Sequence, residues 1–292
     1  MIPSPRQRPP VVPAAAALGM LSGSTLSLLM LTSTSASAAP PLRPHLIFVM
    51  VDDLGWNNVG FRNSELRTPT VDRLATLQGR VLARHYSYQF CSPSRSSAMT
   101  GRFAIHVNER NGPITEPRQG VPLNMTMLPA KLKQAGYATA HVGKWHCGAS
   151  SPAKTPRHRG FDTSLGYFSC CEDHWTNMAS NGPACTPAAH TDLWLDNGPA
   201  FGLNNTGYSG DLFQRRAAEV IRNHTTGRPL FLYYAFHAVH APLEAPPALV
   251  AAYANISNDN VAGDRKMYSA MVGFLDAGLG ALEAELTAKG MW

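Results

Sequence analysis

This sequence of 292 residues lacks the patterns that mark several classes of protein. It holds no Cys-x-x-Cys pair, so nothing in it supports a zinc site. It has no internal repeat, heptad run or low-complexity tract beyond its first residues, which speaks against repeat proteins and coiled coils. Its net charge is +6, but the basic residues are scattered, which argues against a dedicated nucleic-acid surface.

An uninterrupted apolar run long enough for a stable membrane span is also missing. The best candidate, roughly residues 11–31, is broken by proline, glycine and several serines. Arg6 and Arg8 precede this run, and Ala36-Ser37-Ala38 follows it as a small-x-small cleavage site. Residues 1–38 are therefore predicted to be a signal peptide.

The signal peptide predicts that residues 39–292 enter the secretory pathway, with an extracellular or lysosomal destination. The chain is 44% hydrophobic and 15% charged, which is enough apolar material for one well-buried domain. Four Asn-x-Ser/Thr sequons agree with a secreted glycoprotein: Asn124, Asn204, Asn223 and Asn255.

Strand and helix patterns alternate along the chain, which predicts an α/β fold with a mixed, mostly parallel sheet sandwiched by helices. The continuous apolar run at residues 45–51 is typical of a parallel strand that is buried on both faces. Further strands are predicted at residues 81–88, 137–142 and 229–236. Helices are predicted at residues 128–134, 211–223 and 264–289, and a further helix is predicted to begin at Thr68-Pro69, with Val71, Leu74 and Leu77 on one face. Residues 147–208 are predicted to be mostly loops.

Two adjacent carboxylates, Asp52 and Asp53, follow the strand predicted at residues 45–51. Ligands of open α/β sheets bind at the carboxyl ends of the strands. Adjacent carboxylates repel one another, and a divalent cation such as Ca²⁺ or Mg²⁺ relieves that repulsion because it prefers oxygen ligands. The pair therefore predicts a metal site, with a solvated Asp-Asp turn as the alternative.

The segment Cys91-Ser92-Pro93-Ser94-Arg95 places a cysteine and an arginine four residues apart. If a helix begins near Ser92, with Pro93 in its first turn, Cys91 lies at the helix N-terminus and Arg95 reaches back toward it. Free N–H groups, the helix dipole and a guanidinium then favour an oxyanion such as sulfate or phosphate. A thiol in that place is expected to have a lowered pKa. The alternative is a half-cystine or a small buried residue beside a surface arginine.

Basic side chains follow two further predicted strands. Lys144 and His146 are two residues apart, so an extended backbone would place both on one side, where they suit anion binding and proton transfer. The alternative for this pair is a surface lysine beside a packed histidine. His240 follows the strand at residues 229–236 and is a better candidate for the site than His237, which a backbone carbonyl would satisfy.

Taken together, these segments resemble the motifs of the type I sulfatases, in that family's order. Cys91-x-Pro-Ser-Arg95 followed by Thr100-Gly101-Arg102 resembles the family signature. The resemblance covers residues 45–292 and points to arylsulfatase B-like enzymes. The other matching motifs are Val51–Trp56, Gly136-Tyr137 through Gly143–His146, Arg159–Asp162 and Val239–Pro242.

The resemblance implies a nucleophile and a metal. Cys91 corresponds to the cysteine that a formylglycine-generating enzyme oxidises, before folding, to the catalytic aldehyde formylglycine. In the family the hydrate of this aldehyde attacks the sulfate ester. Asp52 and Asp53, together with the oxygen of residue 91, correspond to ligands of a divalent cation, usually Ca²⁺, with Mg²⁺ as the second candidate.

The resemblance also assigns the surrounding basic residues. Arg95 corresponds to the residue that holds the formylglycine hydrate. Lys144 and His240 correspond to sulfate-binding groups, and His146 to a partner of the nucleophile. The implied fold is the alkaline phosphatase and sulfatase fold, and the implied substrates are aryl or carbohydrate sulfate esters.

Relatives of this family continue beyond the matched region. There a further strand ends in an Asp-Asn pair that completes the metal site, and a smaller C-terminal domain follows. The resemblance therefore implies that residues 39–292 are an incomplete catalytic domain. Two alternatives remain: a phosphate or phosphonate ester hydrolase of the same superfamily, and a catalytically incomplete secreted fragment.

Five cysteines are present, and four remain if Cys91 is the nucleophile. Four cysteines allow three pairings. A vicinal Cys170–Cys171 bridge would be strained, so we expect one of these two residues to pair with Cys185. Cys147 has no assigned partner in this scheme.

Overall fold

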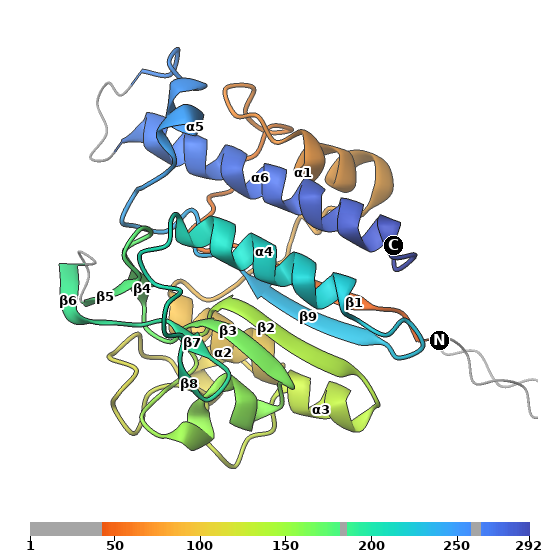
Figure 1. The fold of residues 1–292 in the computed structure, drawn as a ribbon, viewed down its shortest axis with the longest axis vertical. Helices are drawn as coiled ribbons and strands as arrows, with labels where there is room; N and C mark the ends of the chain where they lie inside the picture. The colour runs from red at the N-terminus through yellow and green to blue at the C-terminus, as the bar shows by residue number, and fades with distance from the viewer. Residues whose placement is uncertain (1–42, 182–185, 258–263) are drawn as a thin grey trace, which may run out of the picture. The chain divides into compact units, whose positions relative to one another are not determined.

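The computed structural model describes residues 43–181, 186–257 and 264–292. The predicted signal peptide, residues 1–38, lies outside the described residues, and so does Cys185. In the described part, six strands form one sheet in the order β1-β9-β2-β3-β7-β8 (Figure 1). These strands are β1 (Leu46–Met50), β9 (Leu230–Ala235), β2 (Ala138–Lys144), β3 (Thr163–Tyr167), β7 (Trp194–Leu195) and β8 (Gly198–Pro199). A separate sheet holds β4 (Cys171–Glu172), β5 (Met178–Asn181) and β6 (Thr186–Thr191).

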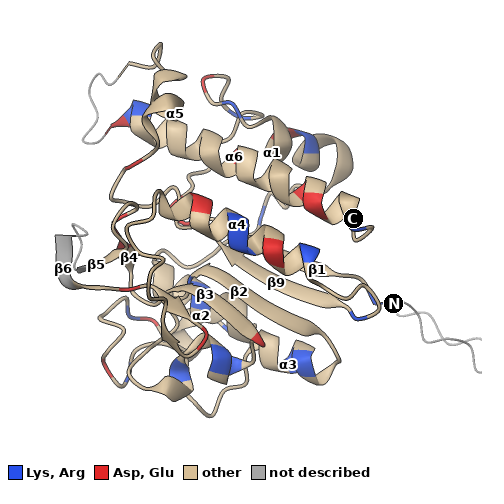
Figure 2. Cartoon of the chain, viewed as in Figure 1, with Lys and Arg blue, Asp and Glu red and all other residues tan. Residues whose placement is uncertain are grey.

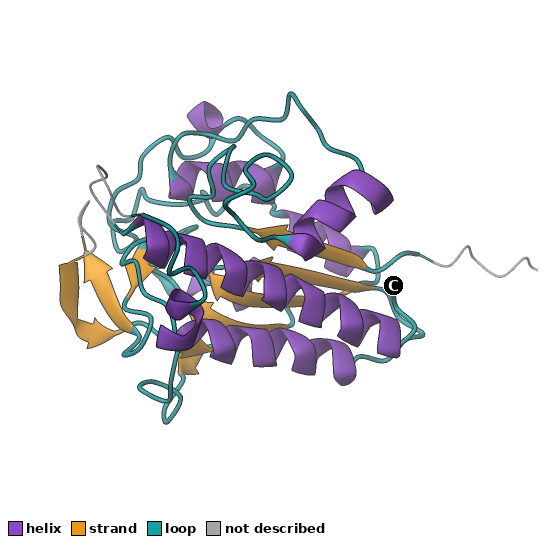
Figure 3. Cartoon of the chain, turned by 90° about the horizontal axis from the view of Figure 1, so that it is seen from above, coloured by secondary structure: helices purple, strands orange, loops and turns teal. Residues whose placement is uncertain are grey.

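The larger sheet is mixed and mostly parallel, as the sequence predicts. β1, β9, β2 and β3 are parallel, whereas β7 and β8 add an antiparallel edge. Helices cover both faces (Figures 1 and 3), and the two long helices α4 and α6 run side by side along one of them. The helices are α1 (Pro69–Arg73, continued by a π-helical turn at Leu74–Gln78), α2 (Cys91–Thr100), α3 (Leu128–Gln134), α4 (Ser209–Arg222), α5 (Pro247–Ala251) and α6 (Arg265–Ala288), with short 3-10 turns at Ala104–His106, Pro152–Lys154 and Pro156–Arg159.

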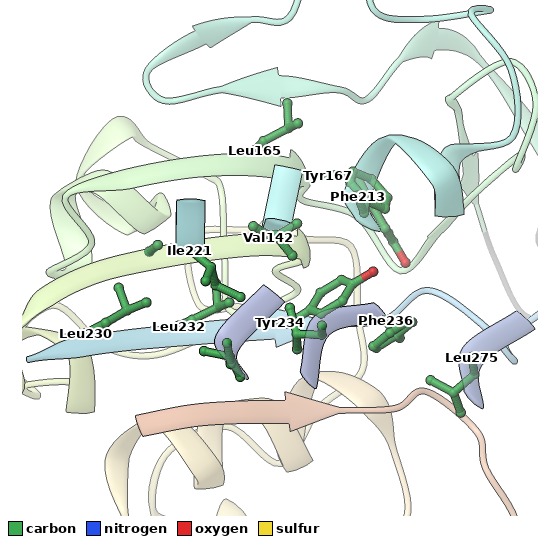
Figure 4. Close-up of a cluster of buried hydrophobic side chains, with 14 of the residues drawn as sticks. Val142, Leu165, Tyr167, Phe213, Ile221, Leu230, Leu232, Tyr234, Phe236 and Leu275 are labelled. Carbon is green, nitrogen blue, oxygen red and sulfur yellow. The ribbon is translucent and has the colours of Figure 1, made fainter. Parts of the chain in front are cut away.

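Successive residues of β9 point to opposite faces of the sheet. Every second residue from Leu230 to Tyr234 packs in a cluster with α4 and α6 (Figure 4). The residues between them, from Phe231 to Ala235, pack on the opposite face in a cluster that includes Met99 of α2. All six residues of β9 are buried, so this strand is the apolar centre of the sheet.

Two strand predictions need correction. β1 is not buried on both faces: it lies at the edge of the sheet, with Leu46 37% exposed and its other residues half-buried. Residues 81–88 do not form a strand, and Leu82 and Tyr86 are 68% and 83% exposed. Their apolar and aromatic composition favours a strand locally, but no neighbouring strand pairs with them among the described residues.

The segment at residues 147–208 is more ordered than predicted, because it contains β3 to β8. The helix after Thr68 also departs from the prediction: its second half is a π-helix, whose wider turn leaves Leu77 79% exposed. By contrast, α3 has the predicted bounds, and α4 and α6 differ from theirs by only one or two residues at their ends.

Figure 2 shows both signs along α4, which carries Asp211 and Glu219 as well as Arg215, Arg216 and Arg222. In the described ranges, none of the helices has both the length and the apolar character that crossing a bilayer requires.

Buried neutral histidines are expected to make the fold sensitive to acid. Burial lowers the pKa of His141 to about 3 and that of His174 to about 4. An unfolded chain takes up these protons near pH ~6.5. Between about pH 6.5 and 4 the unfolded state therefore binds more protons, so stability falls as the pH falls. Each histidine contributes up to about 1.4 kcal/mol per pH unit, which urea unfolding at a series of pH values measures.

A matched pair of variants tests this pH dependence. His141→Phe places an aromatic ring that cannot titrate among Trp145, Phe161 and Tyr233, and is expected to reduce the slope of unfolding free energy against pH. His106 is exposed, so His106→Gln is expected to leave the slope unchanged. An unaltered slope in His141→Phe would show that this histidine does not carry the effect.

Candidate functional site

The candidate site lies where three parallel strands end. β1, β9 and β2 are neighbours, so their carboxyl ends meet at one edge of the sheet. Asp52 follows β1, Lys144 is the last residue of β2, and His240 follows β9. The structure therefore brings together residues that lie far apart in the sequence.

Asp52 is the centre of the charge network at this edge. Its carboxylate accepts a hydrogen bond from Lys144 Nζ, and its Oδ1 lies 3.3 Å from Arg95 Nη2. All three side chains are almost fully buried. Burial opposes the charged form of Asp52, but the charges of Lys144, Arg95 and His240 outweigh it and hold the pKa of this carboxyl below its usual range.

Helix α2 begins at Cys91, close to the predicted start, and Phe90 is its N-cap residue without a side-chain cap. Only part of the predicted oxyanion site is present at this helix end. The N–H group of Ser92 donates to Asn111 Oδ1 at 3.1 Å, and Pro93 has no N–H group. The positive charge of the site therefore comes from side chains more than from the helix N-terminus.

Arg95 connects α2 to the sheet. Its Nη1 donates to the carbonyl oxygen of Lys144 at 3.0 Å and to the hydroxyl of Tyr233 at 3.2 Å. Its side chain is 1% exposed, so it is not the surface arginine of the alternative hypothesis. This arginine holds the start of α2 against the ends of β1 and β2.

The expected lowering of the Cys91 pKa is wrong. The Cys91 thiol is hydrogen-bonded to the thiol of Cys170, and this bond, together with burial, raises the pKa of Cys91. The same bond lowers the pKa of Cys170 to about 6, against the effect of burial. In this thiol pair, Cys170 is therefore the more acidic member.

His240 faces Cys91 and both carboxylates. It is hydrogen-bonded to Cys91, and its Nε2 lies 3.5 Å from Asp53 Oδ2. Burial and Lys144 oppose its charged form, but the bond to Cys91, the Asp52 charge and the carbonyl of Ala241 outweigh them, so the pKa of His240 is raised. His240 therefore lies in the cavity wall beside Cys91, and its role as a site residue stays a prediction.

Two other histidines differ from their predicted environments. His146 does not follow an extended backbone, because its φ is +48°, yet it still lines the cavity next to Cys91. Burial, followed by the charges of Lys144 and Arg95, lowers its pKa well below the usual value. His237 was expected to bond a backbone carbonyl, but neither of its ring nitrogens has a hydrogen-bond partner, and its ring stacks on His174 at 3.8 Å.

The predicted metal ligands are placed unequally. In the described part of the chain, one cluster of metal-binding side chains is found, with ligand atoms of Asp52, Cys91 and His240 within 4.8 Å of one another. Asp53 adjoins this cluster through His240 but is itself 59% exposed and has a φ of +55°. His240 thus lies within this cluster, and the predicted ligand Asp53 lies at its margin.

A cavity of about 1310 Å³ opens in front of these groups. Cys91, His146 and His240 lie in its wall, and residues around 111–115, 149–155 and 190–197 complete it. Phe168 and Trp194 stack at 5.0 Å between ring centres, and both rings line the cavity. The cavity is large enough for a drug-sized or disaccharide-sized ligand.

Sequence reasoning missed Cys170 and Tyr233 as neighbours of the site. Cys170 entered only as a candidate for a disulfide, but its thiol is free, as are those of Cys91 and Cys147. Cys171 is the disulfide-bonded member of the adjacent pair. The sequence around Cys170 and Cys171 does not show which of them lies at the site, because the turn before β4 decides which side chain faces Cys91.

Comparison with known proteins agrees with this geometry. A family model described as Sulfatase matches residues 44–292. Arylsulfatase J of Mus musculus is 36% identical over 259 residues, which are 88% of this chain and 42% of that protein. The N-acetylgalactosamine-6-sulfatase of Canis lupus familiaris is 32% identical over 251 residues, 80% of this chain and 46% of that protein.

A solved structure shares the fold as well. The crystal structure of Ps i-CgsB in complex with k-i-k-neocarrahexaose superposes with a TM-score of 0.71 and 28% identity, covering 86% of this chain and 56% of that one. This chain spans less than half the length of the curated relatives described above. Since the family model covers almost all of the described residues, the chain belongs to the sulfatase family.

Proposed function

We propose that this chain carries the nucleophile and the anion-binding groups of a sulfuric ester hydrolase that cleaves aryl or carbohydrate sulfates. The observation that carries the proposal is the position of Cys91, in the wall of the cavity and within 4.8 Å of ligand atoms of Asp52 and His240. The names of the two curated relatives, an arylsulfatase and an amino-sugar sulfatase, support the same substrate classes.

The charges around residue 91 suit a sulfate group. Lys144 and Arg95 share the carboxylate of Asp52, which leaves an excess of positive charge near residue 91, behind the wall of the cavity. His240 lies beside them, and its bond to residue 91, the Asp52 charge and the carbonyl of Ala241 raise its pKa. Charges that are already in place stabilise the negative charge that grows on the transferred group and its leaving oxygen.

Residue 91 is the proposed nucleophile. Formylglycine at this position supplies an aldehyde hydrate, whose two hydroxyls permit both attack on sulfur and later release of sulfate. His240, which is hydrogen-bonded to the residue 91 side chain, can hold or return a proton there. Arg95, buried and bonded to the carbonyl of Lys144, keeps the start of α2 in position.

The donor set fits a divalent cation in part. Asp52, residue 91 and His240 offer clustered ligand atoms, and Asp53 adjoins them. Ca²⁺ takes about six to eight oxygen ligands, more than these described residues supply. We assign Asp52, Asp53 and the oxygen of a converted residue 91 as its ligands, with Ca²⁺ favoured over Mg²⁺. The cation would supply positive charge beside the sulfate.

The proposed route to the active form is secretory, to an extracellular or lysosomal destination, with a formylglycine-generating enzyme as a partner during maturation. Three of the four sequon asparagines, Asn124, Asn223 and Asn255, are exposed, and Asn204 is half-exposed. Exposure of these side chains is what N-glycosylation requires.

The test is expression of the chain with its leader in a secretory host, followed by peptide mass measurement across residue 91. Conversion replaces CH₂–SH of Cys91 by an aldehyde, and the mass of the peptide that contains residue 91 reveals this change. We expect the converted protein to hydrolyse an aryl sulfate, and Cys91→Ala to lower the rate by roughly 10³-fold or more.

Two controls sharpen this test. Cys91→Ser offers one hydroxyl for attack on sulfur but lacks the second hydroxyl with which a formylglycine hydrate expels sulfate. It is therefore expected to release at most one alcohol per chain and then to remain sulfated. Comparing the hydrolysis rates of an aryl sulfate and an aryl phosphate distinguishes a sulfatase from the phosphate ester hydrolase of the alternative hypothesis, since a sulfatase should hydrolyse the sulfate faster. Equal rates for wild type and Cys91→Ala would contradict the proposal.

A further inference from the structure

Two free thiols meet in the wall of the cavity. Cys91 and Cys170 are hydrogen-bonded to one another, and neither belongs to the disulfide of the neighbouring Cys171. Both side chains are half-buried and line the cavity, so small reagents can reach them. The residues are 79 positions apart in the sequence, and the tertiary fold alone brings them into contact.

The segment that carries Cys170 is held on both sides. Before it, the N–H group of Ser169 donates to Asp192 Oδ2 at 2.7 Å. After it, Cys171 pairs with Ser180 in the small sheet and is disulfide-bonded. Cys170 therefore faces Cys91 because its neighbours on both sides are fixed.

The segment that carries Cys91 is held as well. Cys91 is the first residue of α2, and the first helical hydrogen bond runs from the Ser94 N–H group to the carbonyl of Phe90 at 3.0 Å. Asn111 holds the N–H group of Ser92 at 3.1 Å. Contact between two thiols on fixed backbone segments raises their effective concentration far above that of two thiols in a flexible chain.

We propose that Cys91 and Cys170 are a redox pair that closes to a disulfide in chains whose Cys91 has not been converted to an aldehyde. The oxidant is a small disulfide, RSSR, as found in the glutathione pool of an oxidising compartment. One thiolate attacks RSSR and releases RS⁻; the second attacks the resulting mixed disulfide and releases another RS⁻. Two S–H bonds are lost, one S–S bond forms between the cysteines, and RSSR is reduced to two RSH.

The disulfide and the aldehyde exclude one another, because conversion of Cys91 removes the sulfur that the disulfide requires. In unconverted chains the bridge would occupy the side chain of residue 91 in the wall of the cavity. This inference does not depend on sulfate hydrolysis: it concerns the two thiols as the structure shows them.

The experiment uses the 292-residue chain from a host that leaves Cys91 as a thiol, which peptide mass confirms. The chain is equilibrated with defined ratios of reduced and oxidised glutathione, quenched with an alkylating reagent, and digested without reduction. We expect a cross-linked peptide pair that contains Cys91 and Cys170 and carries no glutathione. Reduction should restore both thiols.

Two variants and one condition serve as controls. Cys147 is buried, 1% exposed, so Cys147→Ser should leave the cross-link unchanged. Cys170→Ser should leave Cys91 able to form only a mixed disulfide with glutathione. In denaturing urea the cross-link between residues 91 and 170 should fall by roughly tenfold or more at the same glutathione ratio, because contact no longer holds the thiols together.

The result for the folded wild-type chain is sufficient to test the proposal, without any variant. A stable glutathione adduct on Cys91 or Cys170, with no cross-link between them, would overturn the proposal. So would a cross-link that forms as well in urea as in the folded chain. A cross-link of either residue to Cys147 instead would show that a different pair of thiols is in contact.

Discussion

Replacing Asp52 by alanine is expected to lower the free energy of unfolding by about 3–5 kcal/mol. Asp52 is 4% exposed and is the only carboxylate that the described residues place in ion pairs with Lys144 and Arg95. Its removal leaves two buried cations without a counter-charge, and such charges are costly in a low-dielectric interior. Urea unfolding at neutral pH with a metal chelator present measures the loss without a contribution from bound cations.

Asp53 provides the matched control for this prediction. It is adjacent in sequence and carries the same charge, but it is 59% exposed and its recorded ion pair is to His240 at 3.5 Å. Asp53→Ala should therefore cost less than about 1 kcal/mol. Asp52→Asn keeps the volume and loses the charge, so it should fall between the two. Equal losses for Asp52→Ala and Asp53→Ala would mean that the buried charge network does not stabilise the fold.

Gly143→Ala is expected to destabilise the chain by about 4 kcal/mol or more. Gly143 lies in β2 one residue before Lys144, and its φ is +97°. A Cβ atom built there would lie 2.0 Å from the carbonyl oxygen of Ala235 in β9. Both backbones are part of the central sheet, so neither can move aside cheaply, and an L-residue at this φ is strained as well.

Gly227→Ala is the control for the backbone argument. Gly227 has no heavy atom within 4 Å of the added Cβ and no positive φ. Its replacement should change stability by no more than about 0.5 kcal/mol. Urea midpoints of the two variants compare them directly, and similar midpoints would refute the close approach of β2 to β9. The comparison also tests how Lys144 is placed, since Gly143 sets the backbone that carries it.

Local signals predicted the elements that carry the site. The start of α2 at Cys91 follows from Pro93 and the polar residues around it, and α3 has the predicted bounds because Pro129 and Gly136 mark its two ends. The strands that lead to Asp52 and His240 were predicted from apolar runs, which are typical of parallel strands, and a strand was also predicted at residues 137–142, just before Lys144.

The failed predictions share one cause, which is that pairing and contact are not local properties. Residues 81–88 have the composition of a strand but lack a partner, and residues 163–167 form β3 because β2 lies beside them. The lowered pKa expected for Cys91 reflected its helix position alone, whereas the contact with Cys170 reverses the direction.

By itself, the sequence determined which residues could do chemistry here: the carboxylates, the Cys91 segment, Lys144 and the histidines lie at the ends of predicted elements, where side chains meet ligands. Only the tertiary structure decided their partners. It placed Asp52 between two buried cations, brought Cys170 to Cys91, and put His240, and not Asp53, in the cluster with Asp52 and Cys91. The physical reason is that strand order and strand-end backbone geometry set these contacts, and both depend on residues distant in the chain.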